Sequence, residues 1–218
     1  MTKWKLRYRD VLGHLDGWIQ SNGCTMSVEI DGSVFGGDDF DGLEPQVLTP
    51  SGKTRFTIHP FHGDLCDCVL EVEIPVAAQG PDGNRVTLLF ATIRLGSPTH
   101  RGAISHLDVL LALQWNGVLV SPSTSSDDFE MALTALQHEL PVGCVLTICF
   151  ACGLSDYSPF GNGLFGHMAC FRDAKEAYRK VDSKQAIFDI WDSMTEFVQE
   201  THSCQEFELR APDTGYRG

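Results

Sequence analysis

The first 120 or so residues alternate between apolar and polar positions in short runs, as β-strands do. The run from 69 to 76 places Leu70, Val72 and Ile74 on one face and polar positions on the other, which is the two-residue period of a half-buried strand. A Pro-Asp-Gly-Asn turn then leads into a second apolar run, from 85 to 95. We expect these two runs to pair antiparallel.

Two dipeptides predict tight β-hairpins. Asp31-Gly32 and Asn116-Gly117 each separate two short apolar runs. Asp-Gly and Asn-Gly favour two-residue hairpin turns because both central residues of such turns need positive φ. The pattern therefore predicts a β-rich part over residues 1–120, made of antiparallel strands and sandwich-like.

The pattern changes after Val120, where a polar Ser-rich connector is followed by helical spacing. Asp127 or Asp128 can cap a helix from about Phe129 to Leu140, with apolar residues three or four positions apart along it. The next run, Cys144 to Phe150, is almost continuously apolar, which favours a strand buried on both faces.

Two further helices are expected near the end of the chain. A short one covers about Ala174 to Lys180, and a longer one runs from Ser183, as N-cap, to about Thr201. The longer helix would bury the stripe Ile187, Ile190, Trp191, Met194, Phe197 and Val198. The fold class predicted is α+β in a single domain, 1–218, β-rich over 1–120, with helices concentrated in the C-terminal third of a cysteine-rich part, 121–218.

Composition and charge narrow the function. The chain of 218 residues is 43% hydrophobic and 21% charged, and its 29 acidic and 16 basic residues give a formal net charge of -13. An acidic chain disfavours nucleic-acid binding, which needs a concentrated positive face. A basic protein partner is electrostatically easier, although acidity can also serve solubility alone.

Targeting signals are not evident in the sequence. No run approaches the roughly 20 apolar residues needed to cross a bilayer, and the basic segment Met1 to Arg9 is not followed by the apolar core of a secretory signal. We therefore expect a cytoplasmic protein without membrane contact. In that compartment its eight cysteines are expected to be reduced thiols or metal ligands rather than disulfides.

Four of the cysteines have the spacing of a metal site. Cys149 and Cys152 form Cys-Phe-Ala-Cys before a Gly-rich stretch, Cys170 follows that stretch, and Cys204 follows the last expected helix. Two thiolates separated by two residues can bind one zinc ion, which prefers four ligands in a tetrahedron. We predict a structural zinc site on Cys149, Cys152, Cys170 and Cys204.

Other interpretations of these cysteines stay open. His167 or His202 can replace one thiol as the fourth ligand. The cysteines can also be small buried apolar residues. A redox pair at Cys149 and Cys152 is less favoured, because such pairs open a helix and here a Gly-rich loop follows.

A second cysteine pair, Cys66 and Cys68, is expected to lie on one face of a sheet. A further metal site combining this pair with His59 and His62 would need contacts that the sequence alone does not establish.

Two glycine-rich segments invite comparison with ligand-binding loops. Asp38, Asp39 and Asp41 loosely resemble a calcium-binding cluster, but EF-hand spacing is absent and a solvated turn is favoured. The run from Gly161 to Gly166 lacks the Lys-Ser/Thr ending of a phosphate loop.

The chain also resembles a known family. The stretch CFACGLSDYSPFGNGLFGHMACFR from Cys149, the segments GGDDFDGLEP and ETHSCQEFE, and the ending TGYRG resemble an uncharacterised family of bacterial hypothetical proteins, known only as a domain of unknown function. The resemblance implies a bacterial cytosolic protein that forms one unit. It brings no activity.

The function favoured by these observations is that of a binding protein. No Gly-x-Ser-x-Gly or His-Glu-x-x-His motif is present, so no catalytic residue is assigned. We predict a non-enzymatic protein-binding module, of the immunity-protein type, stabilised by zinc. The alternative is a metal-dependent or thiol hydrolase using Cys170, His167 and Asp156.

Overall fold

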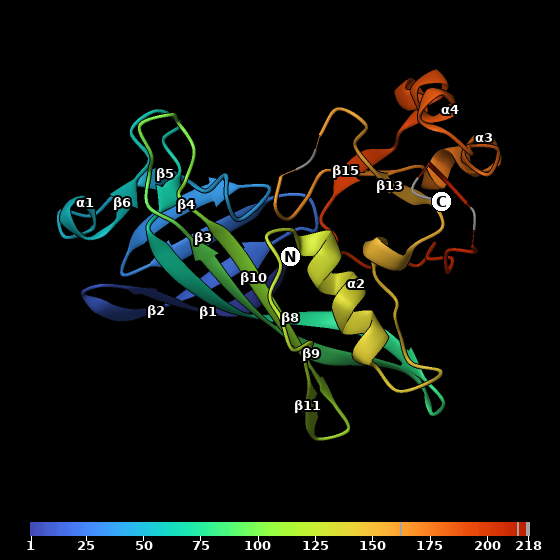
Figure 1. Cartoon of the computed structure of the whole chain (residues 1–218), viewed down its shortest axis with the longest axis horizontal. Helices are drawn as coiled ribbons and strands as arrows, with labels where there is room; N and C mark the ends of the chain where they lie inside the picture. Colours follow the sequence, from blue (N-terminus) through green and yellow to red (C-terminus); the bar gives the residue numbers. More distant parts are fainter. Residues whose placement is uncertain (162, 213, 217–218) are drawn as a thin grey trace.

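The computed structural model describes residues 1–161, 163–212 and 214–216, so Asn162 of the Gly-rich run and Arg217 and Gly218 of the TGYRG ending lie outside it. Most of the strands belong to one antiparallel sheet: β1 (Thr2–Asp10), β2 (Gly13–Ser21), β3 (Met26–Ile30), β4 (Ser33–Gly37), β5 (Glu44–Val47), β8 (Cys68–Gly80), β9 (Gly83–Leu95), β10 (Leu107–Trp115), β11 (Val118–Val120) and β12 (Val145–Leu146). In the described part of the chain these ten strands have the order β11-β10-β9-β8-β1-β2-β3-β4-β5, and β12 pairs with β8 (Figure 1).

The strand alternation expected from the sequence is present in this sheet. Leu70, Val72 and Ile74 of β8 are all buried, and β8 pairs antiparallel with β9 as predicted, with Val72 opposite Ala91. Both hairpin predictions are confirmed, since β3 pairs with β4 and β10 with β11. The chain reverses at each Asp-Gly or Asn-Gly turn with positive φ at both residues, as such turns require.

One helix packs on the large sheet. Helix α2 (Phe129–Glu139) crosses the sheet (Figure 1) and contacts β10. Asp128 caps its first turn by accepting a backbone N–H through its side chain, as predicted. Leu133 and Leu136 of the helix join Leu111 of β10 in the main hydrophobic core.

The last third of the chain forms a smaller unit of short elements beside the sheet (Figure 1). Its three-stranded sheet has the order β13 (Ser155–Tyr157), β14 (Met168–Cys170) and β15 (Glu196–Val198), and its helices are α3 (Lys175–Tyr178) and α4 (Lys184–Asp189). At another corner of the molecule, α1 (Gly52–Arg55) precedes the small hairpin of β6 (Thr57–Ile58) and β7 (Leu65–Cys66).

The predicted fold class, α+β with helices concentrated in the C-terminal third, is wrong. The chain is β-rich, with 42% strand and 16% helix, and its longest described helix has 11 residues. The strands expected to be sandwich-like instead form one large sheet. Cross-strand pairing of long neighbouring strands places them side by side in a single layer, and α2 covers part of it.

Two predicted elements failed for the same reason. The helix capped by Ser183 ends at Asp189 instead of Thr201, because Glu196–Val198 pairs with β14 as a strand. The buried strand expected from Cys144 to Phe150 is reduced to β12, and the chain then turns at Cys149 in a 3-10 helix. Tertiary pairing here overrides local periodicity.

Over the described ranges, no helix has both the length and the apolar character needed to span a bilayer.

Candidate metal centre

The four cysteines predicted to bind zinc come from three separate segments. Cys149 begins the 3-10 helix and accepts the backbone N–H of Cys152 at 3.1 Å. Cys170 ends β14. The backbone N–H of Cys149 donates to the carbonyl of His202 at 2.7 Å, so the segment that carries Cys204 runs beside the first pair.

Electrostatic coupling shows that these thiols are neighbours. Burial, and then the thiols of Cys152, Cys170 and Cys204, raise the pKa of Cys149. Burial also raises the pKa of Cys170, against the opposing effect of Arg172. The structure therefore brings the four cysteines into one region, although they are distant in the sequence.

The thiols are nevertheless not in a closed tetrahedral arrangement. In the described ranges, no three of the four sulfur atoms all lie within 4.8 Å of one another. Ligand sulfurs on one zinc ion are separated by about 3.8 Å, given Zn–S bonds of about 2.3 Å. Zinc binding here would require the side chains to close inward, and it stays a prediction.

The residues considered as alternatives lie in other environments. His202 packs its ring against Gly23. Asp156 is fully buried and accepts hydrogen bonds from the Tyr178 hydroxyl at 2.9 Å and the Tyr216 backbone at 3.0 Å. His167 pairs with two aspartates. The three residues of the hydrolase alternative therefore belong to three different contact networks.

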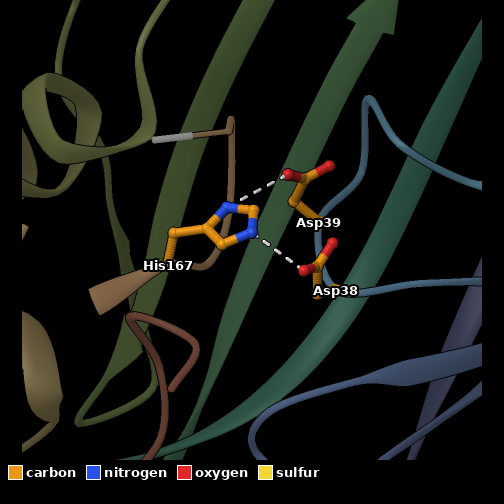
Figure 2. Close-up of side chains that lie close together, drawn as sticks. All are labelled: Asp38, Asp39 and His167. Carbon is orange, nitrogen blue, oxygen red and sulfur yellow. Dashed lines mark ion pairs between the residues drawn. The ribbon is translucent and has the colours of Figure 1, made fainter. Parts of the chain in front are cut away.

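A second group of candidate ligands was not predicted as a set. In residues 1–161, 163–212 and 214–216, one group of three or more His, Cys, Asp or Glu side chains has its ligand atoms all within 4.8 Å of one another: Asp38, Asp39 and His167 (Figure 2). The aspartates follow β4, and the histidine precedes β14. The group thus joins the large sheet to the C-terminal unit.

Backbone features hold these side chains close. His167 has a φ of 59°, a left-handed conformation that is uncommon for residues other than glycine. A Cβ atom at Gly163 would overlap the Asp39 carboxylate, so the Gly-rich loop approaches Asp39 only because this position has no side chain. The Leu164 N–H donates to Asp41 at 2.9 Å and fixes the two loops together.

The tautomer of His167 follows from its contacts. The Gly163 N–H donates to Nδ1 at 3.3 Å, so Nδ1 carries the lone pair. The Nε2 proton then donates to Asp38 Oδ2 at 2.9 Å. Figure 2 shows the ring between the two carboxylates, with Nδ1 facing Asp39 Oδ2 at 3.7 Å.

Asp39 is the least exposed member of this group. Its exposed fraction is 5%, and its Oδ1 has no hydrogen-bond partner in the described structure. Burial, and then contact with Asp41 and the charge of Asp38, raise the pKa of Asp39 to about 8. The backbone N–H of Gly42 opposes this shift. Burial nevertheless disfavours the ionised carboxylate, so a proton or a bound cation would offset its charge.

The sequence interpretation of this loop was wrong on one point. Asp38, Asp39 and Asp41 were expected in a solvated turn, and the structure buries Asp39. No local signal pairs this loop with His167. The closely spaced glycines on both segments were the available hint, because glycine permits close approach of two backbones.

The fold and this group define a β-rich protein with a candidate metal-binding site. The profile of a family of unknown function, DUF6304, matches residues 2–155, and the chain belongs to that family. The resemblance to an uncharacterised family is thereby confirmed. No curated protein and no solved structure matched the chain. The matched region contains Asp38, Asp39, Cys149 and Cys152.

Proposed function

We propose that the protein binds an exchangeable divalent cation at Asp38, Asp39 and His167. The observation that carries the proposal is the buried Asp39 carboxylate, whose Oδ1 lacks a partner in the described structure. Its Oδ2 lies 3.7 Å from His167 Nδ1, the ring nitrogen that carries the lone pair. That gap is long for a hydrogen bond but close to the separation of two ligands on one ion, about 3.4 Å for bonds of about 2.1 Å.

Asp38 has a different role in this proposal. It accepts a hydrogen bond from Nε2–H and so orients the imidazole, as carboxylates do behind metal-bound histidines. The Gly163 N–H shares the Nδ1 lone pair at 3.3 Å and would move away when an ion binds. Asp38 is therefore a positioning residue, with Asp39 and His167 as the direct ligands.

The ligand chemistry favours particular ions. Carboxylates suit Mg²⁺, Ca²⁺ and Mn²⁺, while imidazole suits zinc and the later transition metals. Zinc also accepts carboxylate ligands, so Zn²⁺ suits the mixed set and Mn²⁺ suits its carboxylates. The side chains of Asp38 and His167 are 46% and 33% exposed, which leaves coordination positions open to water or to a group of a partner molecule. Such a cation can bridge the protein to a carboxylate or phosphate.

A titration with Mn²⁺ followed by electron paramagnetic resonance tests this proposal. The signal of free Mn²⁺ should fall with one equivalent of protein for the wild type and for Asp192→Asn, an exposed control. Affinity should fall more than about 100-fold in Asp39→Asn and about 10- to 100-fold in Asp38→Asn. Equal affinity in the wild type and Asp39→Asn would refute the proposal.

A second role, structural zinc binding, is favoured by the grouping of four cysteines. We propose that Cys149, Cys152, Cys170 and Cys204 hold one zinc ion that ties the C-terminal unit to the chain. The coupling of Cys149 to the other three thiols supports this set. Bound zinc would keep the thiols deprotonated, and a site with four protein ligands leaves no position for a catalytic water.

Cobalt substitution distinguishes this site from the first. Thiolate-bound Co²⁺ gives an intense near-ultraviolet charge-transfer band, which carboxylate and imidazole ligands do not give. The band should be present in the wild type and in Cys144→Ser, a buried cysteine of the main core, and absent in Cys149→Ser and Cys204→Ser. A wild-type protein without the band would exclude the thiolate site.

The predicted basic partner and immunity-type role rest on the net charge of -13, the size of the chain and its resemblance to a bacterial family. They stay predictions, and capture of partners from the native host tests them.

A further inference from the structure

A small cavity has Asp41, a neighbour of the proposed cation site, among its lining residues. Its volume is about 190 Å³, and its walls include His59, His62 and Asp64 beside the β6–β7 hairpin, with Asp41 from the loop after β4. Leu95 and Ile104 supply apolar wall. A water molecule occupies about 30 Å³ in the liquid, so this space accommodates a molecule of a few heavy atoms.

His59 is the most informative residue of the cavity. Its exposed fraction is 3%, and its Nδ1 accepts the backbone N–H groups of Phe61 at 3.3 Å and His62 at 3.2 Å. Two amide donors fix the lone pair on Nδ1, so the proton is on Nε2. Nε2 is buried and has no hydrogen-bond partner in the described structure, which is costly unless a ligand supplies an acceptor.

This tautomer argues against a metal at His59. A metal needs the imidazole lone pair, and here both backbone donors hold it on Nδ1. His167 differs because its Nδ1 accepts one backbone N–H, at 3.3 Å, and also lies 3.7 Å from an Asp39 oxygen. The earlier alternative of a metal site on His59, His62, Cys66 and Cys68 is also incomplete, since Cys68 is not among the residues that line the cavity.

The remaining polar groups define what else a ligand must offer. His62 stacks on His59 with 4.8 Å between ring centroids, and its Nε2 lies 2.6 Å from the Gly102 carbonyl, so it is already engaged. Burial, and then Glu44, raise the pKa of Asp64. With Asp41 also in the wall, the cavity offers carboxyl groups that accept hydrogen bonds from a ligand and disfavour an anion.

We propose that this cavity binds a carboxamide group, either of a free small molecule or of an Asn or Gln side chain in a peptide. The carboxamide oxygen accepts from His59 Nε2–H, and the NH₂ group donates to the carboxyl groups of Asp41 and Asp64. A carboxamide combines one acceptor and two donors within a few atoms and carries no charge. Asp41 lies in the wall of this cavity and also contacts Asp39 of the proposed cation site, but none of the carboxamide contacts requires a bound ion.

Nuclear magnetic resonance of the histidine Cε1–H groups tests the proposal, with propionamide as the free probe and propionate as its charged isostere. Propionamide should shift the His59 signal saturably, with a Kd in the millimolar range expected for a ligand of about five heavy atoms. Propionate should not. A capped Gly-Gln-Gly peptide compared with Gly-Glu-Gly tests the peptide source in the same way.

Variants separate the cavity from unspecific effects. Asp64→Asn removes a carboxylate acceptor and should weaken binding about tenfold, while His14→Phe, an exposed histidine, should not. His59→Phe should abolish binding, provided that this variant folds. The comparison of Asp64→Asn with His14→Phe does not depend on the His59 variant. Absence of a saturable shift with both propionamide and the Gln peptide would overturn the proposal, as would an equal response to propionate.

Discussion

The large sheet and the C-terminal unit are stabilised in different ways. The sheet has strands of up to 13 residues, β8 and β9, and a continuous hydrophobic core that includes α2. The C-terminal unit has strands of three residues, two small hydrophobic clusters and grouped thiols. Short strands with little buried apolar surface need another source of stability.

That difference suggests what the polar clusters contribute. The thiols lie within the C-terminal unit, where a metal would compensate for the small core. Asp38, Asp39 and His167 lie at its junction with the sheet, where Asp38 and His167 are partly exposed and Asp39 is buried. We therefore expect the thiolates to bind a structural metal ion, and the carboxylate and imidazole ligands to bind an exchangeable one.

The largest effect is expected from Cys149→Ser. Structural zinc contributes about 10–16 kcal/mol in small zinc-binding peptides, so its loss should unfold the C-terminal unit. Amide hydrogen exchange should then show lost protection over residues 149–209 and intact protection in β8 and β9. Cys144→Ser serves as control and should retain protection in the C-terminal unit. Unchanged exchange in Cys149→Ser would mean that the thiols are only buried apolar residues.

Leu111→Ala should destabilise the sheet instead. Leu111 is fully buried in the main core, and removal of a buried leucine side chain costs about 2–5 kcal/mol. Denaturant unfolding should show this loss, while zinc content remains at the wild-type level. Loss of zinc in this variant would show that the two regions do not fold separately.

Asp128→Ala should have a smaller effect on the same region. The side chain accepts the Met131 N–H at 2.9 Å as the N-cap of α2, and such caps contribute about 0.5–2 kcal/mol. The midpoint of sheet unfolding should fall accordingly, with Asp127→Ala as the neighbouring control. Equal effects of both substitutions would indicate a general charge effect and not a cap.

Glu208→Gln should have the smallest effect, in the C-terminal unit. Hydrogen bonds from Arg179 and then Lys175 lower the pKa of Glu208, at 2.9 Å and 3.2 Å respectively. A lowered pKa contributes stability above the ordinary pKa of Glu and loses it as pH falls through the folded value. The stability difference from wild type should therefore be small at pH 7 and vanish in acid. A difference that grows in acid would contradict the assignment.

The strands and hairpins of the sheet could be predicted because their signals are local. The alternation of apolar and polar residues in β8 involves only a few neighbouring residues, as do the turn sequences at Asp31 and Asn116. The helix after Ser183 could not be delimited, since its apolar stripe continues into β15, where pairing with β14 determines the structure. The local sequence pattern does not show whether this segment forms a helix or pairs as a strand.

The candidate sites show the same limit. The sequence predicted Cys149, Cys152, Cys170 and Cys204 as one set, and the fold brings them near one another, while zinc itself stays a prediction. The group of Asp39 and His167 could not be predicted, because two distant loops meet only in the folded chain. Burial of Asp39 likewise depends on tertiary packing. The acidic, Gly-rich sequence around it is typical of an exposed turn.

Anomalous X-ray diffraction from crystals grown with Mn²⁺ tests the proposed cation site most directly. An anomalous peak about 2.1 Å from both His167 Nδ1 and an Asp39 oxygen, with Asp38 still bonded to Nε2, is the predicted result. The peak should be missing in Asp39→Asn crystals grown under the same conditions. A wild-type map with no peak between these two side chains would contradict the account.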